Sequence, residues 1–126
     1  MRTLITGKVV DFVPTFGTHP DGGCLVLSED GDFAITVDTG FNGGIAIPLE
    51  MMDKMDMEFF GYDTFTLATG DIVELPMFMG KVILDDYESK TWFIPGDSLP
   101  GMAFLSAVGS ILCFDFEDET VELRRH

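Results

Sequence analysis

Short runs of apolar residues, many of them alternating with polar ones, recur along most of the chain. Residues 33–37 show the clearest alternation, because every second side chain is large and apolar, which is typical of a strand with one buried face. The same criterion predicts strands over residues 4–13, 24–27, 45–47, 59–67, 72–84, a segment around Trp92 and Phe93, and residues 111–116 and 120–123. This pattern predicts an all-β fold with one or two short helices.

Turn-forming residues and one helical pattern fill the segments between these strands. Residues 14–23 are rich in glycine and proline and are predicted to form a turn-rich connection. Residues 29–32 are predicted to form a tight turn. Residues 49–57 follow Pro48 and carry apolar side chains at helical spacing, so we expect a helix whose methionines face the core. A methionine-lined peptide groove is the less common alternative.

Asp38, Thr39 and Gly40 directly follow the strand at residues 33–37 and form the main candidate site. The strand would fix the position of the acid, and threonine can hydrogen-bond across a tight turn. Glycine allows backbone or substrate to come close. The alternative interpretation is an Asx-turn in which Asp38 only caps its own backbone. The residues around the tripeptide must decide between the two.

The strand, the Asp-Thr-Gly turn, the glycine-containing loop and the apolar run that ends at Pro48 together resemble the active-site hairpin of retroviral-type (retropepsin-like) aspartic proteases. Residues 37–43, Val-Asp-Thr-Gly-Phe-Asn-Gly, are most similar to small single-domain prokaryotic members of this clan. A second family feature is a hydrophobic-hydrophobic-Gly loop before a short helix and a final pair of strands, and Leu99, Pro100 and Gly101 occupy that place. Pro100 departs from the family's usual aliphatic residue, and proline removes a backbone donor and fixes φ.

The resemblance extends from about residue 33 onward and implies a closed acid-protease-like β-barrel. A length of 126 residues is enough for one domain with a real core but not for two. We therefore expect residues 1–126 to form a single retropepsin-like aspartic protease domain.

In the family, a hairpin flap closes over the substrate, and residues 59–84 occupy the corresponding place in this sequence. By resemblance, the substrate-binding and flap residues are Phe41, Ala68, Thr69, Gly70, Asp71 and Ile72. The alternative is an ordinary surface hairpin whose tip uses the positive φ available to Gly70. Pro76 confines the second arm of this hairpin to an edge or a bulge.

Aspartic proteases activate water between two carboxylates that share one proton, because two such acids close together cannot both ionise. The chain contains one Asp-Thr-Gly, and Asp63-Thr64-Phe65 lacks the glycine. The resemblance therefore implies a homodimer in which each subunit contributes Asp38, Thr39 hydrogen-bonds across to the partner's turn, and Gly40 permits close approach. The expected activity is hydrolysis of a peptide or protein substrate, with Ile45, Ile47 and Leu99 as apolar neighbours that exclude water.

Composition narrows the classes of partner and location. A net charge of −15 opposes binding to nucleic acid and to anionic membrane surfaces. Cys24 and Cys113 are too few and too far apart for a disulfide framework or a zinc motif, so we expect two buried reduced thiols. No cofactor and no metal are expected, and residues 29–32 lack the terminal glutamate of a calcium loop. Residues 1–20 lack a secretory apolar region, so a cytoplasmic protein is expected.

Three other functions are alternatives to an active protease. A catalytically silent β-barrel of the same fold would bind a peptide or serve as a dimerisation module, and Pro100 and Phe41 leave this alternative open. A phosphotransfer turn like that of haloacid-dehalogenase-type enzymes needs alternating strands and helices, and this chain has too little helix. A histidine-activated nucleophile is unsupported, because His19 lies in a turn-rich segment and His126 at the terminus.

Overall fold

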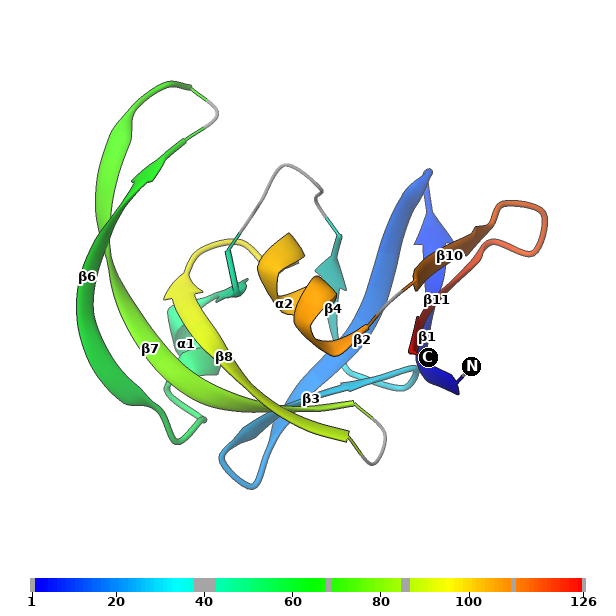
Figure 1. Ribbon diagram of the computed structural model, residues 1–126, viewed down its shortest axis with the longest axis horizontal. Helices are drawn as coiled ribbons and strands as arrows, with labels where there is room; N and C mark the ends of the chain where they lie inside the picture. The colour runs from blue at the N-terminus through cyan, green and yellow to red at the C-terminus, as the bar shows by residue number, and fades with distance from the viewer. Residues whose placement is uncertain (1, 38–42, 68, 85–86, 110, 126) are drawn as a thin grey trace.

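The computed structural model describes residues 2–37, 43–67, 69–84, 87–109 and 111–125, and most of these residues lie in strands (Figure 1). The predicted all-β class is confirmed. The strands are β1 (Arg2–Val10), β2 (Val13–Asp21), β3 (Cys24–Ser28), β4 (Phe33–Thr36), β5 (Ile45–Ile47), β6 (Glu58–Thr66), β7 (Ile72–Leu84), β8 (Tyr87–Pro95), β9 (Leu99–Pro100), β10 (Ile111–Asp115) and β11 (Thr120–Arg125). The helices described are α1 (Leu49–Met52) and α2 (Met102–Val108), neither of them long and apolar enough to cross a membrane.

The described strands form one sheet that curls into half of a barrel, with α2 inside the curve (Figure 1). The order along the sheet is β10-β11-β1-β2-β3-β7-β8-β5-β9, while β4 pairs with β2 and β6 pairs with β7. The first and last strands described in the chain, β1 and β11, pair antiparallel, and Arg2 lies opposite Arg125. The two ends of the described chain therefore lie side by side in the same part of the sheet.

Apolar side chains from the concave face of the sheet and from α2 form the core. Alternation places every second residue of a strand on this face, and the one buried face of α2 supplies Phe104, Leu105 and Val108. The largest fully buried side chains are Phe16, Phe93, Phe104, Leu25, Leu27, Ile35, Ile45, Ile47, Leu84, Val82, Val108 and Val121.

The N-terminal segment differs from the prediction. We expected one strand over residues 4–13 and a turn-rich connection over residues 14–23, but the chain forms two paired strands, β1 and β2. Asp11 and Phe12 connect them with φ of 49° and 66°, in a tight hairpin turn. Such turns usually contain asparagine or glycine, so the sequence around Asp11 gave no recognisable turn signal.

Glycine in β2 serves close packing instead of a turn. A Cβ at Gly17 would collide with the backbone of Ser28 and Gly31, since β3 and the following turn cross very near. Next to it, the fully buried Thr18 donates its hydroxyl hydrogen bond to the carbonyl of Val26, 3.0 Å away. The composition of this segment therefore reflects close packing of β2 against β3 and the turn that follows it.

The predicted helix over residues 49–57 is wrong in length. α1 ends at Met52, and the chain then turns so that the amide of Asp56 donates to the carbonyl of Gly23 at 2.9 Å. Met51, Met52 and Met55 are buried as expected of a core-facing stripe, whereas Leu49 is 58% exposed. The bond between Asp56 and Gly23 directs the chain into β6.

The second half of the chain follows the predicted strands closely. β6 and β7 form a long antiparallel hairpin, and β7 pairs with β8 only from Phe78 to Leu84. In the part of the chain that is described, Pro76 thus lies where β7 has β6 on one side and no paired strand on the other. The expected edge position of Pro76 is confirmed, and an edge is a position where a sheet tolerates proline.

Two phenylalanines that differ in burial, one on β2 and one on β4, test the assignment of the core. Phe16 is 1% exposed and Phe33 is 46% exposed. We expect Phe16→Ala to lower the free energy of unfolding by about 3–5 kcal/mol, because the cavity cannot fill. Phe33→Ala should cost about 1 kcal/mol or less. Urea denaturation followed by circular dichroism measures both, and equal losses would contradict this assignment of the core.

Candidate active site

Asp38, Thr39, Gly40 and Phe41 of the predicted site lie outside the described residues. The structure does describe the residues on both sides of this segment, Val37 and Gly43, together with the elements that hold them. These flanking residues define where the segment starts and ends. The site can therefore be built from its supports.

The backbone that leads to Asp38 is fixed from two directions. The amide of Thr36 donates to the carbonyl of Ser98 at 3.0 Å, and the amide of Val37 donates to the carbonyl of Pro14 at 2.9 Å. Val37 is also buried, at 7% exposure. Since hydrogen bonds and burial leave little freedom at Val37, the chain enters the Asp-Thr-Gly segment in one direction.

The backbone that leaves this segment is packed too closely at Gly44 to carry a side chain there. A Cβ at Gly44 would collide with the carbonyl of Trp92 on β8. From Gly44 the chain continues into β5, which lies between β8, paired in parallel, and β9, paired antiparallel. The glycine predicted in this turn is thus required by contact with a neighbouring strand.

Gly101 brings the second predicted loop against the first. Its amide donates to the carbonyl of Gly44 at 2.5 Å, and a Cβ at Gly101 would collide with the carbonyl of Gly43. Gly101 also immediately precedes α2, whose apolar face enters the core. Gly43 and Gly44, which follow the segment of Asp38, are therefore neighbours of the Gly101 loop in space.

Leu99 and Pro100 form β9, which pairs with β5 so that Pro100 lies opposite Ile45. β9 is the last strand along the sheet order, and an edge is a position where a sheet tolerates proline. Pro100 is buried, so it belongs to the packed base of the loop. The departure from the family pattern at this residue is compatible with a close approach of the two loops.

Ile45 and Ile47, expected to be apolar neighbours that exclude water, lie in the interior of the sheet. Both are fully buried in the core, so they do not form an exposed apolar wall that a substrate could touch. They support the loop from the interior of the sheet, and Ala46 between them is 4% exposed. The side chains that would contact a substrate must come from other segments.

The predicted flap tip is a tight, exposed turn, of which Ala68 lies outside the described residues. The amide of Gly70 donates to the carbonyl of Leu67 at 2.9 Å, and Gly70 has the positive φ, 90°, expected of it. Thr69 Oγ1 donates to Asp71 Oδ2 at 3.1 Å. Ile72 follows at 71% exposure, so a large apolar side chain stands in solvent beside the tip.

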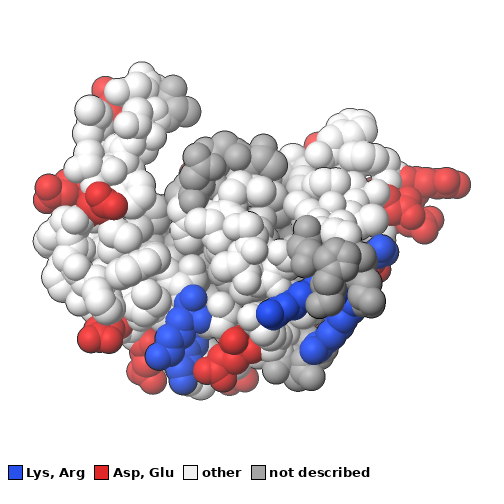
Figure 2. Space-filling view, in the orientation of Figure 1, with Lys and Arg blue, Asp and Glu red and all other residues white. Residues whose placement is uncertain are grey.

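The β6–β7 hairpin extends well beyond the rest of the sheet. Its outer half rises past the end of β8 and bends over the side of the molecule on which β4 ends (Figure 1). In the space-filling view this half forms a separate lobe, with a notch between it and the central part of the molecule (Figure 2). The hairpin thus extends away from the rest of the described sheet, with its tip raised.

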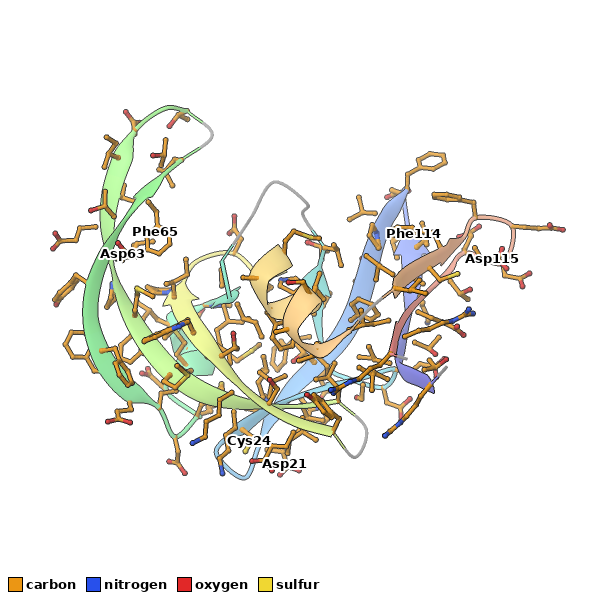
Figure 3. All side chains as sticks on the ribbon, in the orientation of Figure 1. Asp21, Cys24, Asp63, Phe65, Phe114 and Asp115 are labelled. Atoms are coloured by element: carbon orange, nitrogen blue, oxygen red, sulfur yellow. The ribbon has the colours of Figure 1, made fainter. Side chains whose placement is uncertain are left out.

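Figure 3 labels two side chains of β6, Asp63 and Phe65. Phe65, half-buried, lies on the side of the hairpin that faces the body of the molecule. Asp63 accepts a hydrogen bond from the amide of Thr64 at 2.8 Å, so this exposed acid is engaged by its own backbone. Phe65 was not among the predicted site residues, although its place in an alternating strand could have suggested that it faces the body of the molecule.

A cavity of about 540 Å³ lies elsewhere, at the turn between β2 and β3, near Cys24 (Figure 3). Lys81 and Lys90 line it together with Asp56 and Glu58, so its charges are mixed. In the described part of the chain, no three histidine, cysteine, aspartate or glutamate side chains gather as a metal site would require. This cavity opens at the end of the molecule away from the hairpin tip and does not join the two predicted loops.

Comparison with protein-family models, with curated proteins and with solved structures found no match for this chain.

The contact between the two loops can be tested by adding a single methyl group. Gly101→Ala should lower the free energy of unfolding by about 1–3 kcal/mol, because the added Cβ overlaps the backbone of Gly43. Gly96→Ala is the matched control, since a Cβ there would lie 3.4 Å from that of Ala46, at ordinary contact distance. Urea denaturation of both variants measures the difference. An unaffected Gly101→Ala protein would refute the contact.

Proposed function

We propose that the protein is an aspartic endopeptidase that is active as a homodimer. The observation that carries the proposal is the contact of Gly101 with Gly43 and Gly44, which brings the two motifs of the retropepsin resemblance together. The curled half-barrel and the raised hairpin support the same proposal. As part of this proposal, we expect the complete fold to be the closed barrel of acid proteases.

The reaction would use one Asp38 from each subunit. One carboxylate removes a proton from water while the other, protonated, donates to the carbonyl oxygen of the scissile amide. The water oxygen bonds to the carbonyl carbon, and the C–N bond breaks when the nitrogen receives a proton. Both carboxyls share a single proton, so the pair titrates as a unit.

This chemistry needs a fixed position for the acid, and the supports described for Val37 and Gly44 hold the chain on either side of the segment that carries Asp38. Backbone hydrogen bonds to Pro14 and Ser98 hold the strand before Asp38, and they would orient its carboxylate toward the twofold axis. Thr39 would hydrogen-bond to the partner's turn, and Gly40 would permit the two turns to approach. The chemistry needs no metal and no cofactor.

The β6–β7 hairpin would serve as the flap. Its outer half is paired on one side only in the described chain, so it can bend toward a bound peptide without breaking other strand pairs. Phe65 faces the body and would contact the substrate, while Thr69 to Ile72 would close over it. Phe41 would form the wall beside the two carboxylates.

A catalytically silent module of the same fold is the second candidate. Pro100 favours it, because the proline occupies β9 opposite Ile45 and cannot donate a backbone hydrogen bond there. Such a module would bind a peptide or only dimerise. Cleavage of a generic peptide substrate, blocked by a transition-state-mimicking inhibitor of aspartic proteases, separates the two candidates.

Removal of one ionisable oxygen tests the catalytic role directly. Asp38→Asn should keep the fold and the dimer but lower peptide cleavage by at least about a hundredfold, since general acid–base catalysis is lost. Asp63→Asn, in the other Asp-Thr pair of the chain, is the matched control and should cleave normally. Cleavage of a fluorogenic peptide measures both variants.

The Asp38→Asn variant also tests whether the two subunits share one site. In an equimolar mixture of native and Asp38→Asn chains that exchange freely, only about a quarter of the dimers carry two native aspartates. Activity should fall to that fraction of the value expected for all-native dimers at the same total protein. Activity at half of that value would show that each chain acts alone.

Dimer formation should depend on salt. Two chains of −15 each carry −30 in the dimer, so long-range repulsion opposes association until salt screens it. We expect the dimerisation constant to tighten several-fold between about 0.1 M and about 1 M sodium chloride. Sedimentation equilibrium measures the change, and a constant that is independent of salt would contradict the expectation.

A further inference from the structure

β10 is an edge strand without the usual protection of edges. Among the described residues it pairs with β11 alone, and it is the first strand of the sheet order. Natural edge strands carry charges, prolines or bulges that prevent pairing with another chain. The edge strand β6 follows this rule, because it has Glu58, Asp63 and a register shift between Phe59 and Gly61. β10 reads Ile-Leu-Cys-Phe before its first charge at Asp115.

The surface at one end of β10 is also apolar. Phe114 and Phe116 stack with ring centroids 5.9 Å apart, at 39% and 63% exposure. Phe12, at the tip of the neighbouring hairpin, is 88% exposed and lines a pocket of about 210 Å³ together with Phe116. It is unfavourable for an isolated chain to expose three aromatic rings on adjacent hairpins to water, so this surface is suited to contact with another protein.

Charge along the β10–β11 hairpin is separated into two ends. The connection between the strands carries Glu117, Asp118 and Glu119 next to Asp115. At the other end Ile111 lies opposite Arg124, and Arg125 lies opposite Arg2. Figure 2 shows acidic side chains at the tip of this hairpin and basic side chains toward its base. A second hairpin laid antiparallel would set each acidic end against a basic end.

We propose that two copies of this chain associate by pairing their β10 strands antiparallel across a twofold axis. Full overlap of the five residues of β10 places Cys113 opposite Cys113 of the second copy and Ile111 opposite its Asp115. Arg124 already shares a face with Ile111, as directly paired residues do, so Asp115 of the second copy would lie in the same row of side chains. The two sheets become one sheet through the axis.

This interface gives the proposed homodimer its contact surface, and in that respect it rests on the proposed function. Opposite charges would meet in the row that holds Arg124, Ile111 and the second copy's Asp115, although Arg124 is also bound to Glu122 of its own chain and the net charge repels. The interface also covers the unprotected edge with backbone hydrogen bonds that have no competitor among the described strands.

Cys113 reports the register directly. Directly opposed residues of antiparallel strands have Cα atoms about 4.5–5.5 Å apart, within the range that a disulfide spans. Treatment with copper–phenanthroline and dissolved oxygen removes two protons and two electrons from the two thiols, which then form one S–S bond. We expect a disulfide-linked dimer from the native chain and from Cys24→Ser, and none from Cys113→Ser. Cross-linking that needs Cys24 would overturn the proposal.

Two substitutions of opposite charge at Ile111 test which residues face each other across the interface. Ile111→Lys would face Asp115 of the second copy and Ile111→Glu would repel it, at two equivalent places in the dimer. We expect the dimerisation constant to tighten about threefold to tenfold for lysine and to weaken by a similar factor for glutamate. Leu49→Lys and Leu49→Glu, at 58% exposure on α1, give the effect of net charge alone.

The outcomes separate this interface from the proposed function. A monomer at every salt concentration, or an Ile111 pair that behaves like the Leu49 pair, would overturn the interface whatever the activity. Linked dimers that cleave no peptide would refute the protease and leave the interface standing. Cleavage by dimers that neither link through Cys113 nor respond at Ile111 would place the shared Asp38 residues on another contact.

Discussion

The close approach of two glycines is the constraint on which the rest of the structure depends. Gly44 rests against the backbone of Trp92, and Gly101 rests against Gly43 and Gly44, so three backbone segments meet where any side chain would force them apart. β5 can lie between β8 and β9 only because of this contact. The same contact ties the end of the Asp-Thr-Gly segment to the start of α2, and through α2 to the core.

Much of the fold follows from local pattern, and the misses have identifiable physical causes. The strands after Glu58 alternate or carry long apolar runs, and their predicted ranges agree with β6, β7, β10 and β11 to within a few residues. The first hairpin was missed because Asp11 and Phe12 adopt positive φ without a glycine. Gly17 in β2 is a packing residue that resembles a turn signal. Cys24 and Cys113, expected to be buried, are half-buried free thiols.

The candidate site was less predictable than the fold, because its supports are distant in sequence. Nothing near Val37 indicates that Pro14 and Ser98 hold its strand through backbone carbonyls. Burial of Ile45 was likewise hidden, since an apolar strand beside a site can serve either the core or a substrate. What the sequence did reveal was the pair of motifs around Asp38 and Gly101, and at Gly101 the contact with Gly43 leaves no room for a side chain.

Because the outer β6–β7 arm is paired on one side only, its surface can change without a loss of stability in the rest of the domain. The residues between Phe78 and the tip of the hairpin contribute little to the core, so their replacement leaves the global stability nearly unchanged. Selection can therefore reshape the surface that this arm presents, in size, charge or length, while the sheet beneath keeps its sequence. Such a domain can change the surface of one arm and still keep its fold.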